Sequence, residues 1–91
     1  MADPIREYVI SRHAAEEMHR RQIDEAIVHQ VMAAPEQRHN VRLGRDVLQS
    51  RIEVGGRMYL VRVIVDVDRT PAEVVTAYRT SSIARYWRAQ P

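Results

Sequence analysis

The sequence predicts an α+β fold in which two N-terminal helices pack on one face of a three- to four-stranded antiparallel sheet, followed by a short C-terminal helical turn. Two observations carry this prediction. Apolar residues recur at helical spacing up to Pro35 and alternate with a period of two after it. The three glycines lie beyond Pro35, at Gly44 and at the pair Gly55–Gly56, where hairpin turns are expected. Residues 1–91 suffice for a single domain with one modest core.

Each expected helix has a start signal and a stop signal. Ser11 is placed to cap a first helix from Arg12 to about Arg21, and Asp24 is placed to cap a second. Pro35 ends the second helix because the residue before a proline disfavours helical geometry. Residues 5–10, which precede the first helix, fit a short strand or an extended lead-in.

The rest of the chain alternates like strands separated by turns. Gly44 and the pair Gly55–Gly56 supply two of the turns, and the segment DRTP supplies a third. Ser81 or Ser82 is placed to cap a final short helix. The expected strands are residues 37–43 at an edge, 46–54, 57–67 and 72–80.

The glycine turn fixes which side chains share a face of the hairpin. If Val54 pairs with Arg57, an apolar set that includes Leu48 and Val63 faces the helices. Arg51 and Arg62 then lie diagonally adjacent on the other face. That face is either a solvated surface with scattered ion pairs or an arginine platform for a phosphate backbone.

Strand parity in residues 72–80 places Tyr78 and Arg79 on opposite faces. Burying an unpaired arginine costs more than exposing a tyrosine. We therefore expect Tyr78 to be substantially buried and Arg79 to lie on the open face or at its rim. Tyr86 and Trp87 are expected to fold back as a lid over apolar surface.

The composition and the charge of the chain narrow the classes of partner that we expect. The net charge is only +2, but all 14 basic residues are arginine, whose planar guanidinium suits phosphate and base stacking. Residues 74–91 contain three arginines and no acid, which makes the C-terminal end electropositive. There is no cysteine and no apolar run long enough to span a bilayer, so we expect a cytoplasmic protein without a membrane partner.

Few residues can carry chemistry. A Gly-rich phosphate loop, a nucleophile elbow and a close carboxylate pair are all missing from the sequence. His13 lies in the first turn of the first helix, where it either shuttles a proton or packs locally. His13 and Glu17, like Glu25 and His29, are four residues apart, but no third ligand is apparent, and no metal or cofactor is expected. The remaining arginines and hydroxyl groups suit phosphodiester cleavage of RNA without metal.

Two blocks resemble a known bacterial family, domain of unknown function 4258. SRHAAEEMHRRQI resembles its opening and VVTAYRTSSIARYW its close. The family usually has arginine where this chain has Glu17, which can instead form a helix-surface ion pair with Arg21. The matching residues are His13, Ala14, Met18, Arg21 and Ile23 in the first block, and Val74, Val75, Thr76, Tyr78, Thr80 and Ser81 in the second.

The resemblance implies similarity to RelE/ParE-like toxins and to the barnase-, EndoU- and colicin-like ribonucleases, with any active site on the open sheet face. The leading hypothesis is a toxin-like protein that cleaves RNA without metal, acting on free or ribosome-associated RNA and controlled by an antitoxin. A non-catalytic protein-binding domain of the same fold and a domain with another role are the alternatives. The candidate catalytic residues are His13, Arg51, Arg62, Tyr78 and Arg79.

Overall fold

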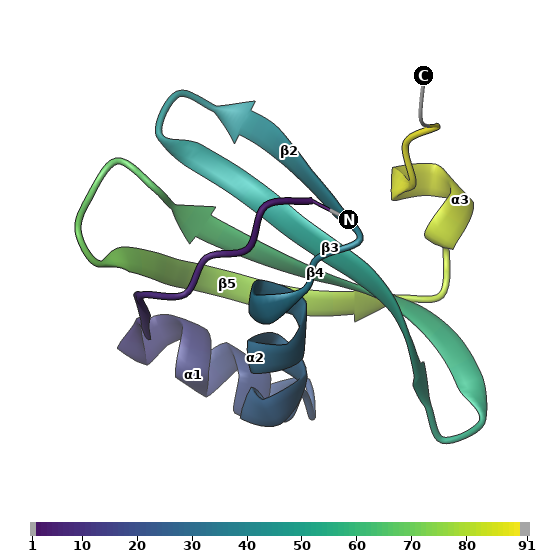
Figure 1. The fold of residues 1–91 in the computed structure, drawn as a ribbon. Helices are drawn as coiled ribbons and strands as arrows, with labels where there is room; N and C mark the ends of the chain where they lie inside the picture. The colour runs from purple at the N-terminus through teal and green to yellow at the C-terminus, as the bar shows by residue number, and fades with distance from the viewer. Residues whose placement is uncertain (1, 90–91) are drawn as a thin grey trace.

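The computed structural model describes residues 2–89 and has an α+β architecture (Figure 1). Helices α1 and α2 cover one face of a five-stranded sheet, and α3 follows the last strand. The strands lie in the order β1-β5-β4-β3-β2. The elements are β1 (Tyr8–Ile10), α1 (Arg12–Arg20), α2 (Glu25–Ala33), β2 (Gln37–Arg42), β3 (Arg45–Val54), β4 (Arg57–Asp66), β5 (Ala72–Thr80) and α3 (Ile83–Tyr86).

The sheet has more strands than predicted, and it is mixed. Strand β1 pairs in parallel with the start of β5, whereas every other pair is antiparallel. The expectation of a three- to four-stranded antiparallel sheet was therefore wrong. Strand β1 contains three residues, too few for alternation to distinguish a strand from an extended lead-in.

The helix boundaries follow the sequence signals. The Ser11 hydroxyl accepts a hydrogen bond from the Ala14 backbone N–H at 3.0 Å, as expected of an N-cap. Asp24 occupies the N-cap position of α2, and α2 ends at Ala33 before Pro35. Gln22, with a φ of 57°, makes the left-handed turn between the two helices.

The hairpin of β3 and β4 has the predicted register. Val54 pairs with Arg57, and Leu48 pairs with Val63. Gly55 and Gly56 both have positive φ, which the tight turn requires. The core consequently forms between the helices and one sheet face. Its members are Ala14, Met18, Ile23, Val28, Val31, Met32, Leu48, Ile52, Val61, Val63, Val65, Val74 and Ala77.

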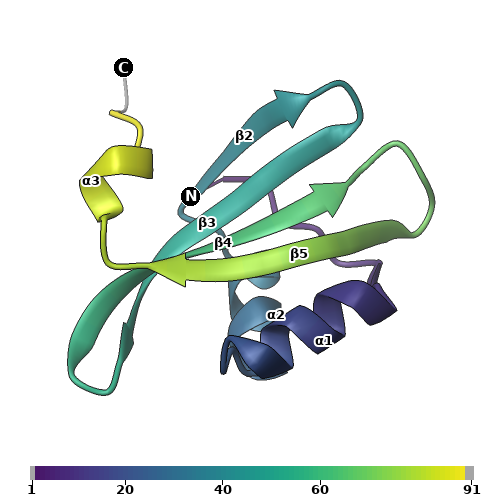
Figure 2. The ribbon, with the colours of Figure 1, turned by 180° about the vertical axis from the view of Figure 1, so that it is seen from behind.

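The two faces of β5 are the reverse of the prediction. Tyr78 pairs with Arg62 and lies on the face away from α1 and α2, whereas Arg79 pairs with Val61 on the helix side. The prediction assumed that an arginine on the helix side would be buried. The ends of β5 and of the β3–β4 hairpin instead extend past the helices (Figures 1 and 2), and Arg79 is only half-buried there.

Candidate functional site

A row of polar side chains crosses the open face of the sheet. Gln37 pairs with Gln49, Gln49 with Arg62, and Arg62 with Tyr78, so four neighbouring strands each contribute one residue. Gln37 and Gln49 are buried, with 2% and 0% of their surfaces exposed. Buried amides require hydrogen-bond partners, and these four side chains supply them to one another.

The hydrogen bonds of the row run without a break. Arg62 donates from Nη1 to the Tyr78 hydroxyl at 2.6 Å and from Nε to the Gln49 Oε1 at 2.8 Å. Gln49 donates from Nε2 to the Gln37 Oε1 at 2.8 Å. The row is thus a connected network that fixes the position of the Arg62 guanidinium.

The chain after β5 is held against this row. The Gln37 side chain donates to the backbone oxygen of Arg88 at 2.5 Å and accepts from its N–H at 3.2 Å. Gln49 donates to the backbone oxygen of Tyr86 at 3.1 Å. Residues 83–89, called the tail below, therefore fold back onto the face opposite α1 and α2.

Aromatic side chains of the tail lie over two of the predicted arginines. The Arg62 guanidinium carbon is 4.4 Å from the centre of the Tyr86 ring, and that of Arg51 is 4.2 Å from the centre of the Trp87 ring. Arg51 also pairs with Glu36 at 2.8 Å. The tail folds back as predicted, and its two aromatic rings lie over cations.

His39 lies on the same face of the sheet, two residues after Gln37 on β2. Its Nε2 is 3.3 Å from the Gln37 Oε1. Burial, followed by the nearby positive charges of Arg88 and Arg62, lowers the pKa of His39 below its ordinary value of 6.5. The imidazole is therefore neutral at pH 7 and stands beside cations.

The network also favours one tautomer of the neutral His39 ring. Gln37 pairs with both the backbone N–H and the backbone oxygen of Arg88, so its Oε1 can only be the atom that accepts. The Nε2 of His39 faces that oxygen at 3.3 Å, which favours the tautomer that carries the proton on Nε2. Nδ1 is left with the lone pair that can take up a proton.

A cleft of about 820 Å³ lies between the start of β2 and the tail. Its lining includes His39 and Arg88, together with the partly buried ring of Trp87. Within residues 2–89 the Arg88 side chain has no acid within ion-pair distance, although its backbone is held by Gln37. A neutral imidazole, a guanidinium and an aromatic ring thus share one concave site.

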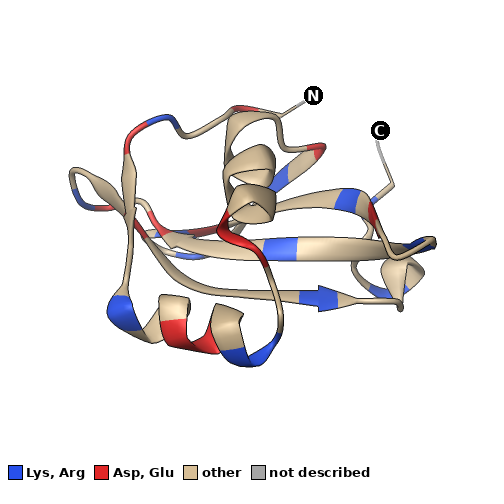
Figure 3. Ribbon diagram, turned by 90° about the horizontal axis from the view of Figure 1, so that it is seen from below, with Lys and Arg blue, Asp and Glu red and all other residues tan. Residues whose placement is uncertain are grey.

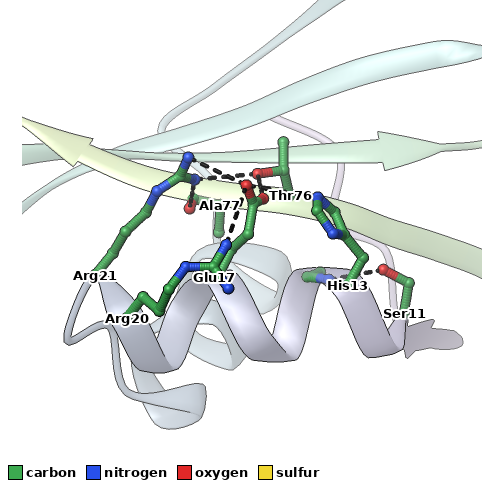
Figure 4. A network of polar contacts seen from close by, with 8 residues as sticks. Ser11, His13, Glu17, Arg20, Arg21, Thr76 and Ala77 are labelled. Atoms are coloured by element: carbon green, nitrogen blue, oxygen red, sulfur yellow. Dashed lines mark hydrogen bonds and ion pairs between the residues drawn. The ribbon is translucent and has the colours of Figure 1, made fainter.

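A second polar cluster lies at the edge of β5, on α1 (Figure 4). Thr76 donates to Glu17 at 2.6 Å, and Arg21 donates to the Thr76 hydroxyl at 3.2 Å and to the Ala77 backbone oxygen at 2.9 Å. His13 lies 3.5 Å from the other oxygen of Glu17. The Thr76 hydrogen bond, aided by Arg21, holds the pKa of Glu17 below its usual value.

The structure divides the five predicted site residues among three places. Arg51, Arg62 and Tyr78 share the open face, as predicted for the two arginines. His13 belongs to the cluster on α1 and lies on the helix side, away from them. Arg79 lies over the Tyr59 ring at 4.9 Å, on the helix side at the end of the sheet.

A model of one protein family matches most of the chain. The family is described as Domain of unknown function (DUF4258), and the match covers residues 10–79. The chain belongs to this family. No curated protein and no solved structure matches it.

The DUF4258 match contains the cluster on α1 and the whole polar row, but it ends before the tail. Arg21 and Thr76, from opposite ends of the matched region, meet at the β5 edge. Glu17, which stands where an arginine was expected, makes the anticipated ion pair with Arg21 at 3.3 Å. Trp87 and Arg88 lie beyond the matched residues.

Sequence reasoning missed His39 and Arg88. His39 lies in a short edge strand, and only its alternation with Gln37 could have placed it on the open face. Arg88 follows the last helix, and its position depends on hydrogen bonds from residues about 50 positions earlier. No local pattern encodes that contact.

No group of three or more His, Cys, Asp or Glu side chains between residues 2 and 89 is arranged to hold a metal ion. None of the helices in that range has the length and apolar composition of a membrane span.

Proposed function

We propose that this protein is a toxin-like, metal-independent endoribonuclease of the RelE/ParE-like kind, part of a toxin–antitoxin system. The observation that carries the proposal is that one cleft holds both a neutral histidine and an arginine, and that the arginine has no acidic partner among residues 2–89. His39 and Arg88 line one cleft, and the positive charge of Arg88 is one cause of the lowered pKa of His39. RNA cleavage requires both a proton acceptor and a cation of this type.

In the proposed reaction the 2′-hydroxyl of RNA attacks the adjacent phosphorus. Nδ1 of His39 takes the hydroxyl proton as the oxygen–phosphorus bond forms. The bond from phosphorus to the 5′-oxygen breaks, and the imidazolium returns the proton to that oxygen. Arg88 stabilises the additional negative charge on the phosphorus centre, and the products are a 2′,3′-cyclic phosphate and a 5′-hydroxyl.

The arginines of the open face have supporting roles in this proposal. Arg62 adds positive potential, because its charge contributes to the lowered pKa of His39. Arg51 and Arg62 also hold the rings of the tail, which keeps Arg88 beside the cleft. Tyr78 lies three strands from β2, about 14 Å at the usual strand spacing, so it suits binding of a neighbouring base.

The test is cleavage of single-stranded RNA by purified protein in EDTA. His39→Asn should lower the rate about 100-fold or more without weakening RNA binding, in line with the usual contribution of a general base. His13→Asn is the matched control, because His13 lies on the other side of the sheet, and it should retain the rate per folded molecule. Equal rates for His39→Asn and wild type would refute the assignment.

A protein-binding role without catalysis is the second candidate. The Gln37 and Gln49 side chains hold the backbone of the tail, so this face already binds an extended peptide segment within the chain. A segment of an antitoxin could bind the same groups. Induced expression in a bacterium distinguishes the candidates: growth arrest with intact total RNA favours protein binding, whereas growth arrest with fragmented RNA favours the ribonuclease.

A further inference from the structure

Trp87, the only tryptophan of the chain, borders the cleft that holds His39 and Arg88. The guanidinium carbon of Arg51 lies 4.2 Å from the centre of the Trp87 ring and covers one face of it. Arg51 is not part of the cleft lining. The part of the ring that borders the cleft is therefore surface that Arg51 leaves open.

The Trp87 ring is held in place from two directions. Behind it, Glu36 accepts hydrogen bonds from the Arg51 backbone N–H at 2.7 Å, from its Nε at 3.2 Å and from its Nη2 at 2.8 Å, which fixes the guanidinium. Along the chain, the backbones of Tyr86 and Arg88 are hydrogen-bonded to the polar row. A ring that is already positioned loses little freedom when a ligand binds against it.

The rest of the cleft suits a flat apolar group beside an anion. Its volume is about 820 Å³, and its lining between α2 and β2 includes Ala34 and Pro35. The tail lies beside the start of β2 and supplies the aromatic wall (Figure 1). The lining contains a carboxylate, Glu36, but Arg51 pairs with it at 2.8 Å and cancels its charge. No uncompensated acid in the described lining would repel a phosphate.

We propose that Trp87 is the stacking platform for an unpaired base next to the phosphate that is cleaved, and that it gives the cleft a preference for purines. This inference rests on the proposed ribonuclease activity. Bases stack on aromatic rings in single-stranded complexes, and the sequence preferences of such sites follow stacking strength. A purine has two fused rings to overlap with the indole, whereas a pyrimidine has one.

The neighbouring charge favours a nucleotide over an aromatic side chain of a protein as the occupant. The Arg88 side chain has no acid within ion-pair distance among residues 2–89, and it borders the same cleft as Trp87. Each base of an RNA strand brings a phosphate that can pair with this guanidinium. A base inside a duplex has both faces covered by its neighbours, so the cleft should accept single strands only.

A fluorescence titration tests the proposal, because Trp87 is the only source of tryptophan emission. The probe is a 2′-O-methyl oligoadenylate, which cannot be cleaved because the attacking hydroxyl is blocked. It should change the emission of the wild-type protein. An oligouridylate of the same length should bind about threefold or more weakly, and a duplex should leave the emission unchanged at the same concentration.

Variants measured with a fluorescein-labelled oligoadenylate identify the ring responsible. Trp87→Leu should lose about 10-fold in affinity and should no longer prefer adenine to uracil, whereas Trp87→Phe should retain most of both. Tyr59→Leu is the matched control, because it removes another ring that lies against arginines, on the helix side of the sheet. It should bind like wild type.

Unchanged emission on saturation with oligoadenylate, or equal affinities of Trp87→Leu and wild type, would refute the stacking site even if RNA is cleaved. Equal binding of the oligoadenylate and the oligouridylate would refute the purine preference. A change in emission with a purine preference, but no cleavage of the unmodified strand, would refute the ribonuclease and support Trp87 as a base-binding residue.

Discussion

Arginine has different partners at the two ends of the molecule. Around α1 and the turns that precede β3 and β5, guanidiniums pair with carboxylates, as Arg38 does with Asp46 at 2.9 Å and Arg45 with Asp66 at 2.6 Å. Figure 3 shows acidic and basic bands side by side on α1. At the end that holds the hairpin tip and the tail, guanidiniums lie over aromatic rings instead, as Arg62 and Arg79 do.

The difference separates structural cations from available ones. A carboxylate partner cancels the charge of an arginine, whereas an aromatic ring fixes its position and leaves the charge in place. Arg51 is the exception at the aromatic end, because it has both Trp87 and Glu36 as partners. The aromatic end is therefore where an anionic ligand would find uncompensated charge.

The largest expected effect comes from removing an uncompensated cation. Arg62→Gln should lower RNA cleavage about 100-fold, since the variant loses both the potential at His39 and the contact with Tyr86. Arg45→Gln, which removes a cation already paired with Asp66, should change the rate per folded molecule less than twofold. Similar losses in both variants would mean that the contrast between the two ends has no functional meaning.

Gln49 tests whether the aromatic end depends on its polar row for stability. Gln49→Leu removes one hydrogen-bond partner each from Gln37, Arg62 and the Tyr86 oxygen, and should lower the free energy of unfolding by about 1–3 kcal/mol. Urea denaturation measures this loss. Glu16→Gln, which removes one exposed ion pair on α1, should change the same quantity by less than about 0.5 kcal/mol.

The pH dependence of cleavage should report His39. Because its folded pKa lies below 6.5, the activity should be fully present at pH 7 and should fall only as the pH drops through that lowered value. The neutral form also favours the native state, so the associated stability is present above 6.5 and is lost as the pH falls through the folded pKa. An acid limb centred above 6.5 in the pH–rate profile would contradict the assignment.

The smallest effect is expected at the carboxylate of the α1 cluster. The pKa of Glu17 is lowered by the Thr76 hydrogen bond, so its contribution is present above the ordinary value of 4.5 and is lost as the pH falls through the folded pKa. Glu17→Gln should lower the melting temperature at pH 7 and have a smaller effect near pH 3. A difference that does not change with pH would show that packing, rather than charge, accounts for Glu17.

Local patterns predicted the fold where a single signal decides it. The Gly55–Gly56 turn fixed the hairpin register, which placed Arg51 and Arg62 on the open face. Ser11 and Pro35 set the helix boundaries in the same way. Each of these features depends on a few adjacent residues, so it can be predicted from the local sequence.

The remaining errors come from contacts between distant parts of the chain. The bulge between Ile64 and Val65, where the register of β4 and β5 shifts, is invisible to simple alternation. The faces of Tyr78 and Arg79 were assigned from a burial cost that does not arise beyond the ends of the helices. The tail and the His39 cleft depend on Gln37, whose partner at Arg88 lies 51 residues away.

The pairing of the first strand with the last has a consequence for synthesis of the protein. Strand β1 can join the sheet only after β5, its neighbour in the sheet, has been made. A ribosome therefore releases α1, α2 and the β3–β4 hairpin before the sheet can close, and such long-range pairing slows folding. The tail emerges after β5 and brings Arg88 to His39 last, so a nascent chain has its helices before it has its cleft.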